Sequence, residues 1–215
     1  MNENRKRLER HLMEMWYWYL LVPVLVIALW SFGFGLLDRI PYREQINIFV
    51  GAYEVQETEM ENRVFELLKD SDIRQVTVDP CTPGAEEAFY MVLSTRGTVN
   101  TDVLILPEGT WPEAFSQGKV LMFSEEEISP YLPEGEYRYL TQDDNIYGIC
   151  IYDAKTKVSL LSDNWIDFEK DPEGRDYYLF LNVDSENVGQ LGRKSEASDD
   201  QALQLLKRII HITEE

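Results

Sequence analysis

The amino-acid sequence predicts an α/β protein in which one N-terminal transmembrane helix is followed by a single, mainly parallel-sheet domain. Three observations carry this prediction. Residues 16–37 contain no charged side chain, residues 46–116 alternate between strand-like and helix-like segments, and the connections between those segments are short. Consecutive strand–helix–strand units with short connections are typical of parallel sheets covered by helices on both faces.

The uncharged segment 16–37 has the length of a membrane span. As a helix it would extend about 33 Å, enough for a hydrocarbon core of about 30 Å. Aromatic residues gather at both of its ends, as they do at membrane interfaces. A cleaved signal peptide would have a shorter apolar run and a small-residue exit, so a retained anchor is the favoured interpretation and cleavage near 31–35 the alternative.

Basic residues flanking the segment predict its orientation. Four precede it and two follow it, namely Arg5, Lys6, Arg7 and Arg10, then Arg39 and Arg43. Positive side chains are retained on the cytoplasmic side. We therefore expect a cytoplasmic tail over 1–15, a linker over 38–45 and an extracytoplasmic domain over 46–215, in a single-pass protein of the cell membrane.

The charge of the chain excludes some partners. The net charge is −19, and of the 20 basic and 39 acidic residues only four and three precede residue 38, which leaves 16 and 36 for the remainder. Such a domain repels phosphate backbones, so no nucleic acid is expected. Cys81 and Cys150 are expected to be free thiols rather than a disulfide. The two histidines, His11 and His211, form no metal-ligand cluster, and no cofactor is expected.

The first part of the domain alternates strand and helix. The expected elements are strand 46–50, helix 59–69, strand 75–78, helix 84–95, strand 102–106 and helix 111–116. Thr58 and Glu61 have the spacing of a capping box for the first of these helices. Ala88, Met91 and Val92 are expected on the inward face of the second helix. The continuously apolar strand 102–106 predicts burial on both faces of the sheet.

The second part of the domain is less regular. Ser124 precedes three glutamates and predicts a helix start. A turn leading into a strand is expected over 143–151, further strands over 158–161 and 177–182, and a terminal amphipathic helix over 199–212. Residues 163–176 are polar and contain Pro172 and Gly174, so an exposed loop is expected there.

Four segments resemble extracellular solute-binding proteins of the type II periplasmic-binding class, which serve ABC-type importers. INIFVGAY resembles the opening strand of a lobe, TDVLILPEG its third strand, IYGICIYD the strand before the crossover, and YYLFLNVDS the return segment. The resemblance implies a periplasmic-binding-protein-like lobe. No cysteine follows the apolar segment, and the domain has about half the usual length, so a single-lobe, membrane-tethered relative is expected.

Candidate ligand-binding residues follow the predicted strands, because ligands of such sheets bind outside the carboxyl ends of the strands. Glu108, Gly109 and Trp111 follow the buried strand, and Tyr53 and Glu54 follow the first one. An aromatic ring with nearby carboxylates suits a sugar or a small cationic solute. The structural alternative is that Trp111 packs against the helix start while Glu108 is solvated.

Two further candidates have structural alternatives of the same kind. Thr82 opens the second helix, where free amides could hold an anion, although a simple helix cap is the more frequent role. Tyr147 could form another wall of the site or pack in the core.

Motifs of catalysis are absent from the exported sequence, which has no nucleophile elbow and no phosphate-binding loop. A non-enzymatic role is therefore expected. The leading hypothesis is a solute-binding-like protein, accessory to an ABC-type transporter, that binds a small polar or cationic solute. The alternative is a protein-interaction module of an envelope complex that has lost its ligand.

Overall fold

The computed structural model describes residues 3–37, 39–84, 86–111, 118–142, 145–193 and 200–210. The chain divides into two compact units, Met1–Ile40 and Pro41–Glu215. The predicted helix over 111–116 lies outside the described residues except for Trp111, and so do residue 199 and residues 211 and 212 of the predicted terminal helix.

The first unit is one helix, α1, which extends over Glu3–Leu37 and therefore begins well before the predicted apolar segment. Within it, the 22 residues Met13–Phe34 are long and apolar enough to cross a membrane, and none of the side chains in this window is buried. A signal sequence near an N-terminus has the same length and composition. Pro23 lies inside the helix, which continues through it.

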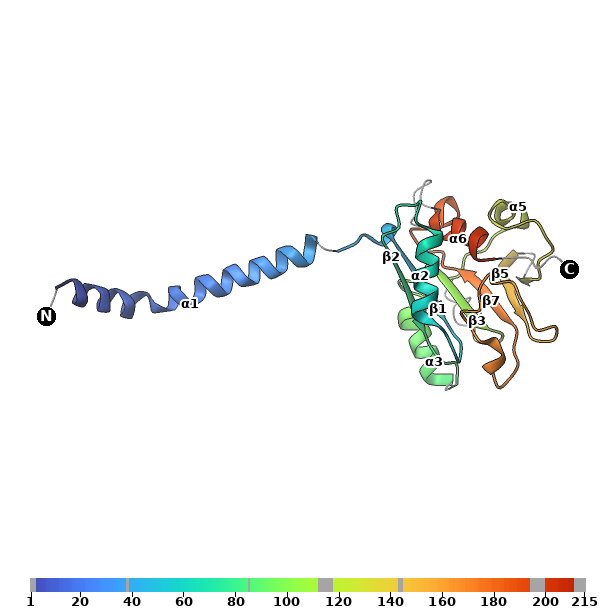
Figure 1. Cartoon of the computed structure of the whole chain (residues 1–215), viewed down its shortest axis with the longest axis horizontal. Helices are drawn as coiled ribbons and strands as arrows, with labels where there is room; N and C mark the ends of the chain where they lie inside the picture. Colours follow the sequence, from blue (N-terminus) through green and yellow to red (C-terminus); the bar gives the residue numbers. More distant parts are fainter. Residues whose placement is uncertain are drawn as a thin grey trace. The chain divides into compact units, whose positions relative to one another are not determined.

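The second unit contains a seven-stranded sheet. Its strands are β1 (Gln45–Val50), β2 (Gln75–Pro80), β3 (Val103–Pro107), β4 (Tyr139–Gln142), β5 (Asn145–Asp153), β6 (Val158–Ser159) and β7 (Tyr177–Leu181). The strand order is β2-β1-β3-β7-β5-β4, and β6 pairs with β5. Figure 1 labels β2, β1, β3, β7 and β5 of this sheet. All predicted strands are present, whereas the short edge strand β4 was not predicted.

The sheet is mixed, so the prediction of a mainly parallel sheet is wrong. β1 pairs in parallel with β2 and β3, as the alternating pattern predicts. β7 lies between β3 and β5 and is antiparallel to both, so β5 runs in the direction of β1 and β3. Hydrophobic periodicity reports which face of a strand is buried but not its direction, and no crossover helix separates β5 from β7.

Helices cover both faces of the sheet. α2 (Glu57–Leu67) and α6 (Gln201–Ile209) bury their apolar side chains against one face, together with Ile48, Val50 and Ile105. α3 (Glu86–Val92) continues into a π-helical turn over Leu93–Gly97 and covers the other face. A methyl group added to Gly97 would lie 2.8 Å from Leu93, so this turn packs closely. The short helix α5 (Glu125–Ile128) begins at the predicted Ser124 cap.

Two predicted helix details are wrong. α2 begins at Glu57, one residue before Thr58, and Glu61 accepts a hydrogen bond from the Val78 amide instead of closing a capping box. In α3 the buried residues are Phe89 and Leu93, whereas Ala88 is exposed and Met91 is 63% exposed. The large apolar side chains of Phe89 and Leu93 fill the core better than alanine does, and they decide which face of the helix turns inward.

The segment 163–176 is an exposed loop only in part, since Pro172 to Gly174 are exposed but other residues are buried. Trp165 is 1% exposed, and Ile166, Phe168 and Asp171 are buried as well. Proline, glycine and charged residues dominate the sequence of this segment, but its three large apolar side chains extend the core beyond the sheet. The segment therefore forms a wall of the domain.

Candidate functional site

The carboxyl ends of β1, β3 and β5 share one edge of the sheet because these three strands run in the same direction. β7 begins at that edge, since it is antiparallel to β3 and β5. The segments that leave or enter the sheet there are 51–56, 108–111, 153–157 and 163–176. We call this edge the carboxyl rim. It is the edge at which the sequence predicts a ligand site.

Two of these segments pair with each other. Val55 forms an antiparallel bridge with Ile166. The Gln56 amide donates to the Trp165 carbonyl at 2.8 Å, and the Asp167 amide donates to the Glu54 carbonyl at 3.1 Å. This pairing fixes the backbones of Glu54 and Asp167 beside each other, although they are far apart in the sequence.

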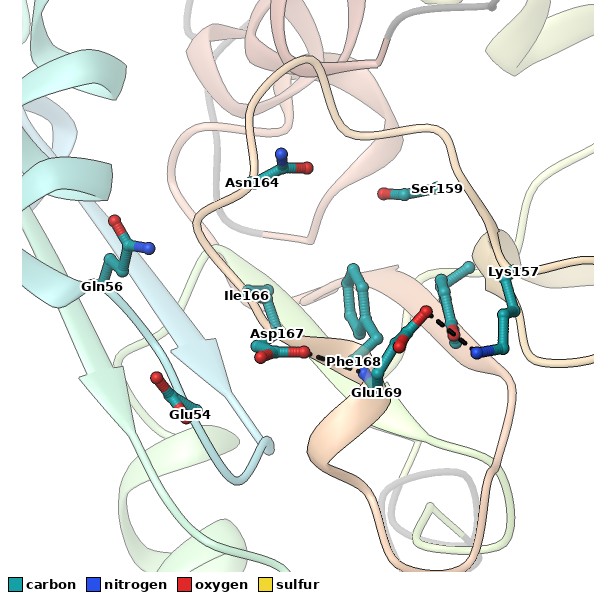
Figure 2. Close-up of a pocket in the computed structure, with 10 residues that line it drawn as sticks. Glu54, Gln56, Lys157, Ser159, Asn164, Ile166, Asp167, Phe168 and Glu169 are labelled. Atoms are coloured by element: carbon teal, nitrogen blue, oxygen red, sulfur yellow. Dashed lines mark hydrogen bonds and ion pairs between the residues drawn. The ribbon is translucent and has the colours of Figure 1, made fainter.

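A cavity of about 370 Å³ opens beside this pairing. Its lining residues come from three segments of the rim and from the adjoining strands β5 and β6: Glu54, Gln56, Tyr152, Lys157, Ser159, Asn164, Ile166, Asp167, Phe168 and Glu169. Figure 2 shows Glu54 and Gln56 on one side, Lys157 on the other, and Asp167, Phe168 and Glu169 between them. The rings of Tyr152 and Phe168 stack at 4.6 Å and provide an apolar surface. We call this cavity the rim pocket.

The rim pocket carries excess negative charge. It is lined by the carboxylates of Glu54, Asp167 and Glu169 and by one ammonium group, that of Lys157. Lys157 Nζ lies 3.1 Å from Glu169 Oε1, so this pair is largely neutral. Glu54 is paired as well, since its Oε2 lies 3.9 Å from Lys170 Nζ, so Asp167 supplies the excess negative charge. Asp167 Oδ1 accepts a hydrogen bond from the Glu169 amide at 3.2 Å, which orients its carboxylate at the start of the 3-10 turn Phe168–Lys170. The pocket thus suits a small polar ligand with a positive charge.

A buried ion pair holds the wall of the pocket in place. Arg175 Nε donates to Asp171 Oδ2 at 2.9 Å, and the Tyr177 hydroxyl donates to the same oxygen at 3.1 Å. The Asp171 side chain is fully buried. Burial is the main cause that raises the pKa of Tyr177, and the Asp171 charge adds to it, so Tyr177 remains a hydrogen-bond donor. Asp171, which lies within the segment 163–176, is thus connected to the first residue of β7 through the Tyr177 hydroxyl.

The turn after β3 has a structural role. Gly109 has a φ of +86°, and Thr110 Oγ1 donates to the Pro107 carbonyl at 2.7 Å. Glu108 is exposed, and its amide donates to the Asp176 carbonyl at 2.8 Å. Trp111 packs its ring 5.2 Å from that of Tyr178 and 5.3 Å from that of Phe180. The Trp111 ring is thus partly buried against the core on the face opposite α2. The structural alternative places Trp111 against the start of the predicted helix, which lies outside the described residues.

The other sequence candidates are spread over the domain. Glu54 is the one predicted residue that lines the rim pocket. Tyr53 and Thr82 both lie 3.8 Å from the position of a methyl group on Gly84, so they meet at the exits of β1 and β2. Tyr147 is the third residue of β5 and lies at the edge of the sheet opposite the rim, where it packs against the core.

Sequence reasoning missed most of the pocket residues. Lys157 has a positive φ of 59° in the turn between β5 and β6, and Asp167 to Glu169 lie in the segment for which the sequence predicts an exposed loop. The run WIDF over 165–168 is an available signal, because three of its four side chains are large and apolar within an otherwise polar segment.

A cluster around Arg138 was not predicted either. Its Nη2 lies 2.6 Å from Asp176 Oδ2 and 2.8 Å from the Cys150 sulfur, and its Nη1 lies 3.2 Å from Asp153 Oδ2. Burial raises the pKa of the Cys150 thiol, and the Arg138 charge only partly offsets this effect. Cys150 and Cys81 are both free thiols, as predicted. The cluster joins β4, β5 and β7 at the rim.

Metal binding finds no support in the part of the chain that the structure describes. No group of three histidine, cysteine or acidic side chains lies close enough there to hold a metal ion. Comparisons of the chain with protein-family models, with curated proteins and with solved structures find no match.

Proposed function

We propose that this chain is a single-pass membrane protein whose extracytoplasmic domain binds a small cationic solute in the rim pocket and serves as an accessory to a transporter. The observation that carries the proposal is the rim pocket itself. It places three carboxylates, one lysine and two stacked rings around about 370 Å³. A volume of this size accommodates an amine, an amino acid or a monosaccharide.

The anchor is supported by α1. Its 22-residue apolar window, aromatic ends and preceding basic residues agree with a retained span whose N-terminus is cytoplasmic. Retention rather than cleavage is favoured because the residues after the window include large apolar side chains instead of a small-residue exit.

The relation to solute-binding proteins remains part of this proposal. It is supported by the parallel unit β2-β1-β3 and by a pocket outside the carboxyl ends of β1 and β5. A positively charged ligand is favoured because the pocket is lined by three carboxylates: Glu54 and Glu169 are paired with Lys170 and Lys157, and Asp167 adds a further negative charge. The stacked rings of Tyr152 and Phe168 offer a surface for an alkyl chain or a sugar face.

A protein-interaction module is the second candidate. One observation favours it, namely that the Trp111 ring after β3 packs against Tyr178 and Phe180 and does not line the rim pocket. Under this reading the rim pocket has no small-molecule ligand, and the domain contacts a partner protein of the envelope instead.

A thermal-shift measurement on the full chain in detergent separates the two candidates. Polyamines, basic amino acids and sugars are added at millimolar concentration. A ligand at ten times its dissociation constant adds about 1.4 kcal/mol, which corresponds to a shift of about 4 °C for a domain of this size. The double variant Glu54→Gln/Asp167→Asn should abolish the shift, while Glu134→Gln, at an exposed position outside the pocket, should retain it. The absence of a shift with all three ligand classes would rule out the solute-binding proposal in favour of the interaction module.

A further inference from the structure

A buried polar cluster lies at the edge of the sheet opposite the rim pocket. Its centre is Asp102, which directly precedes β3 and is 5% exposed. Its Oδ2 accepts a hydrogen bond from the Asn47 amide at 2.7 Å. Its Oδ1 accepts from Ser185 Oγ at 2.5 Å and from Asn187 Nδ2 at 3.1 Å. All three partners are donors, so the cluster is built around an ionised carboxylate.

Asn187 connects this carboxylate to the segment through which the chain enters the domain. Besides Asp102, its Nδ2 reaches the Gln45 carbonyl at 2.8 Å and the Tyr42 carbonyl at 3.4 Å. Residues 42–45 are the first turn and the first strand residue after the linker. One amide group therefore ties the entry segment to the Asp102 carboxylate.

The same amide has an unsatisfied atom. Asn187 is 1% exposed, and its Oδ1 is buried without a hydrogen-bond partner. A buried acceptor without a donor costs about 1–3 kcal/mol. A cavity of about 140 Å³ adjoins the cluster and is lined by Tyr42, Asn47, Asp102 and Ser185, among other residues. This space allows the surrounding side chains to change their orientation.

We propose that Asp102 and Asn187 form a proton-operated latch, which holds residues 42–45 when Asp102 is ionised and releases them when Asp102 takes up a proton. A protonated carboxyl group is a hydrogen-bond donor and therefore needs an acceptor. The adjacent Asn187 side chain carries one, its unpartnered Oδ1. Rotating the Asn187 amide by half a turn presents Oδ1 to the Asp102 hydroxyl. The rotation removes Nδ2 from the Gln45 and Tyr42 carbonyls and sets an oxygen against them, so the entry segment loosens.

The surroundings of Asp102 place this change in the mildly acidic range. Burial raises the pKa of Asp102 to about 6, hydrogen bonds from Ser185, Asn47 and Asn187 oppose the rise, and the Glu186 charge adds to it. The other charged groups near the cluster and the entry segment are Arg43 and two ion pairs, Asp184 with Lys119 and Glu44 with Arg74. Each of these two carboxylates has a basic partner, whereas Glu186 acts on Asp102 directly.

Hydrogen–deuterium exchange of the full chain in detergent tests the latch. Backbone amides of residues 43–47 are followed at about pH 5 and about pH 7.5, with labelling times corrected for the intrinsic exchange rate. We expect about fivefold faster corrected exchange at the lower pH in the wild type. In Asp102→Asn, which carries no charge, exchange should be fast at both pH values. Equal corrected exchange in the wild type, or a pH effect that persists in Asp102→Asn, would overturn the proposal.

A second variant keeps the test decisive if Asp102→Asn does not fold. Glu186→Gln removes the like charge that acts on Asp102 and leaves the hydrogen bonds of the cluster intact. The pH midpoint of the exchange change should therefore move to lower pH in this variant, while the size of the change stays the same. An unchanged midpoint would contradict the role of Asp102 as the titrating group.

Discussion

Glu61 Oε1 accepts a hydrogen bond from the Val78 amide at 2.9 Å, so a side chain of α2 closes the outer edge of strand β2. β2 is the first strand of the sheet and pairs only with β1 within the described sheet. The Val78 amide would otherwise be open to pairing with another chain, and Pro80 in the same strand has no amide proton to offer. Edge strands blocked in this way resist association.

Replacing Glu61 with alanine should therefore weaken the fold and expose the edge. The expected loss is about 1 kcal/mol of unfolding free energy, the typical net value of one hydrogen bond. The urea midpoint of the full chain in detergent measures the loss, and light scattering at increasing protein concentration measures association. Glu61→Gln keeps an acceptor oxygen and serves as the control. A midpoint equal to that of the wild type in Glu61→Ala would show that the bond does not contribute.

The buried Asp102 gives the stability of the protein a specific pH dependence. Its pKa is raised from 3.8 to about 6 in the fold, so the folded state binds this proton more tightly than the unfolded state. The stability it contributes is fully present below about pH 4 and is lost as the pH rises through about 6. A rise of this size corresponds to about 3 kcal/mol.

The comparison of wild type with Asp102→Asn isolates this contribution. Urea unfolding of both proteins is measured between about pH 4 and about pH 7. The other titrating groups contribute equally to both unfolding free energies, so their contributions cancel in the difference. From the lower to the higher pH, the wild type should lose about 3 kcal/mol of unfolding free energy relative to Asp102→Asn. A difference that stays constant over this range would disprove the raised pKa.

Removing Asp171 should be among the most damaging single changes in the domain. Asp171→Ala leaves the Arg175 guanidinium, whose side chain is only 16% exposed, without its buried partner, and it removes the acceptor of the Tyr177 hydroxyl. Breaking a buried pair on one side costs about 3–5 kcal/mol. The urea midpoint checks this value. Glu173→Ala removes the exposed second partner of Arg175 and should cost less than about 1 kcal/mol.

The sequence predicts the elements of this fold better than their arrangement. The apolar runs of β1, β3, β5 and β7 are all visible, because burial dictates the side chains of each strand. The direction of β7 is not visible, since Tyr177 to Leu181 are buried on both faces and would read the same in a parallel or an antiparallel strand. Whether a strand lies parallel or antiparallel to its neighbours depends on contacts between residues that are far apart in the sequence.

The sequence predicts a site at the edge of the sheet where the rim pocket lies, but with mostly different residues. Glu54 is shared by both because it follows a recognisable strand. Asp167 and Lys157 are not predicted because neither follows a strand exit of the parallel unit, and the pairing of 54–56 with 165–167 is a contact over more than 100 residues. For Trp111 the sequence leaves both a ligand site and core packing open, and the contact with Phe180 depends on a strand far away in the sequence.

The position of β7 also bears on how the domain is made. This strand is late in the chain, yet it lies in the centre of the sheet, where it is the sole direct link between β3 and β5. During synthesis, the strands on the two sides of β7 cannot join into one sheet until residue 181 has left the ribosome. Assembly then depends on contacts of long sequence separation, which makes folding slow. A nascent chain halted before Tyr177 would expose the apolar edges of both pieces to chaperones and proteases.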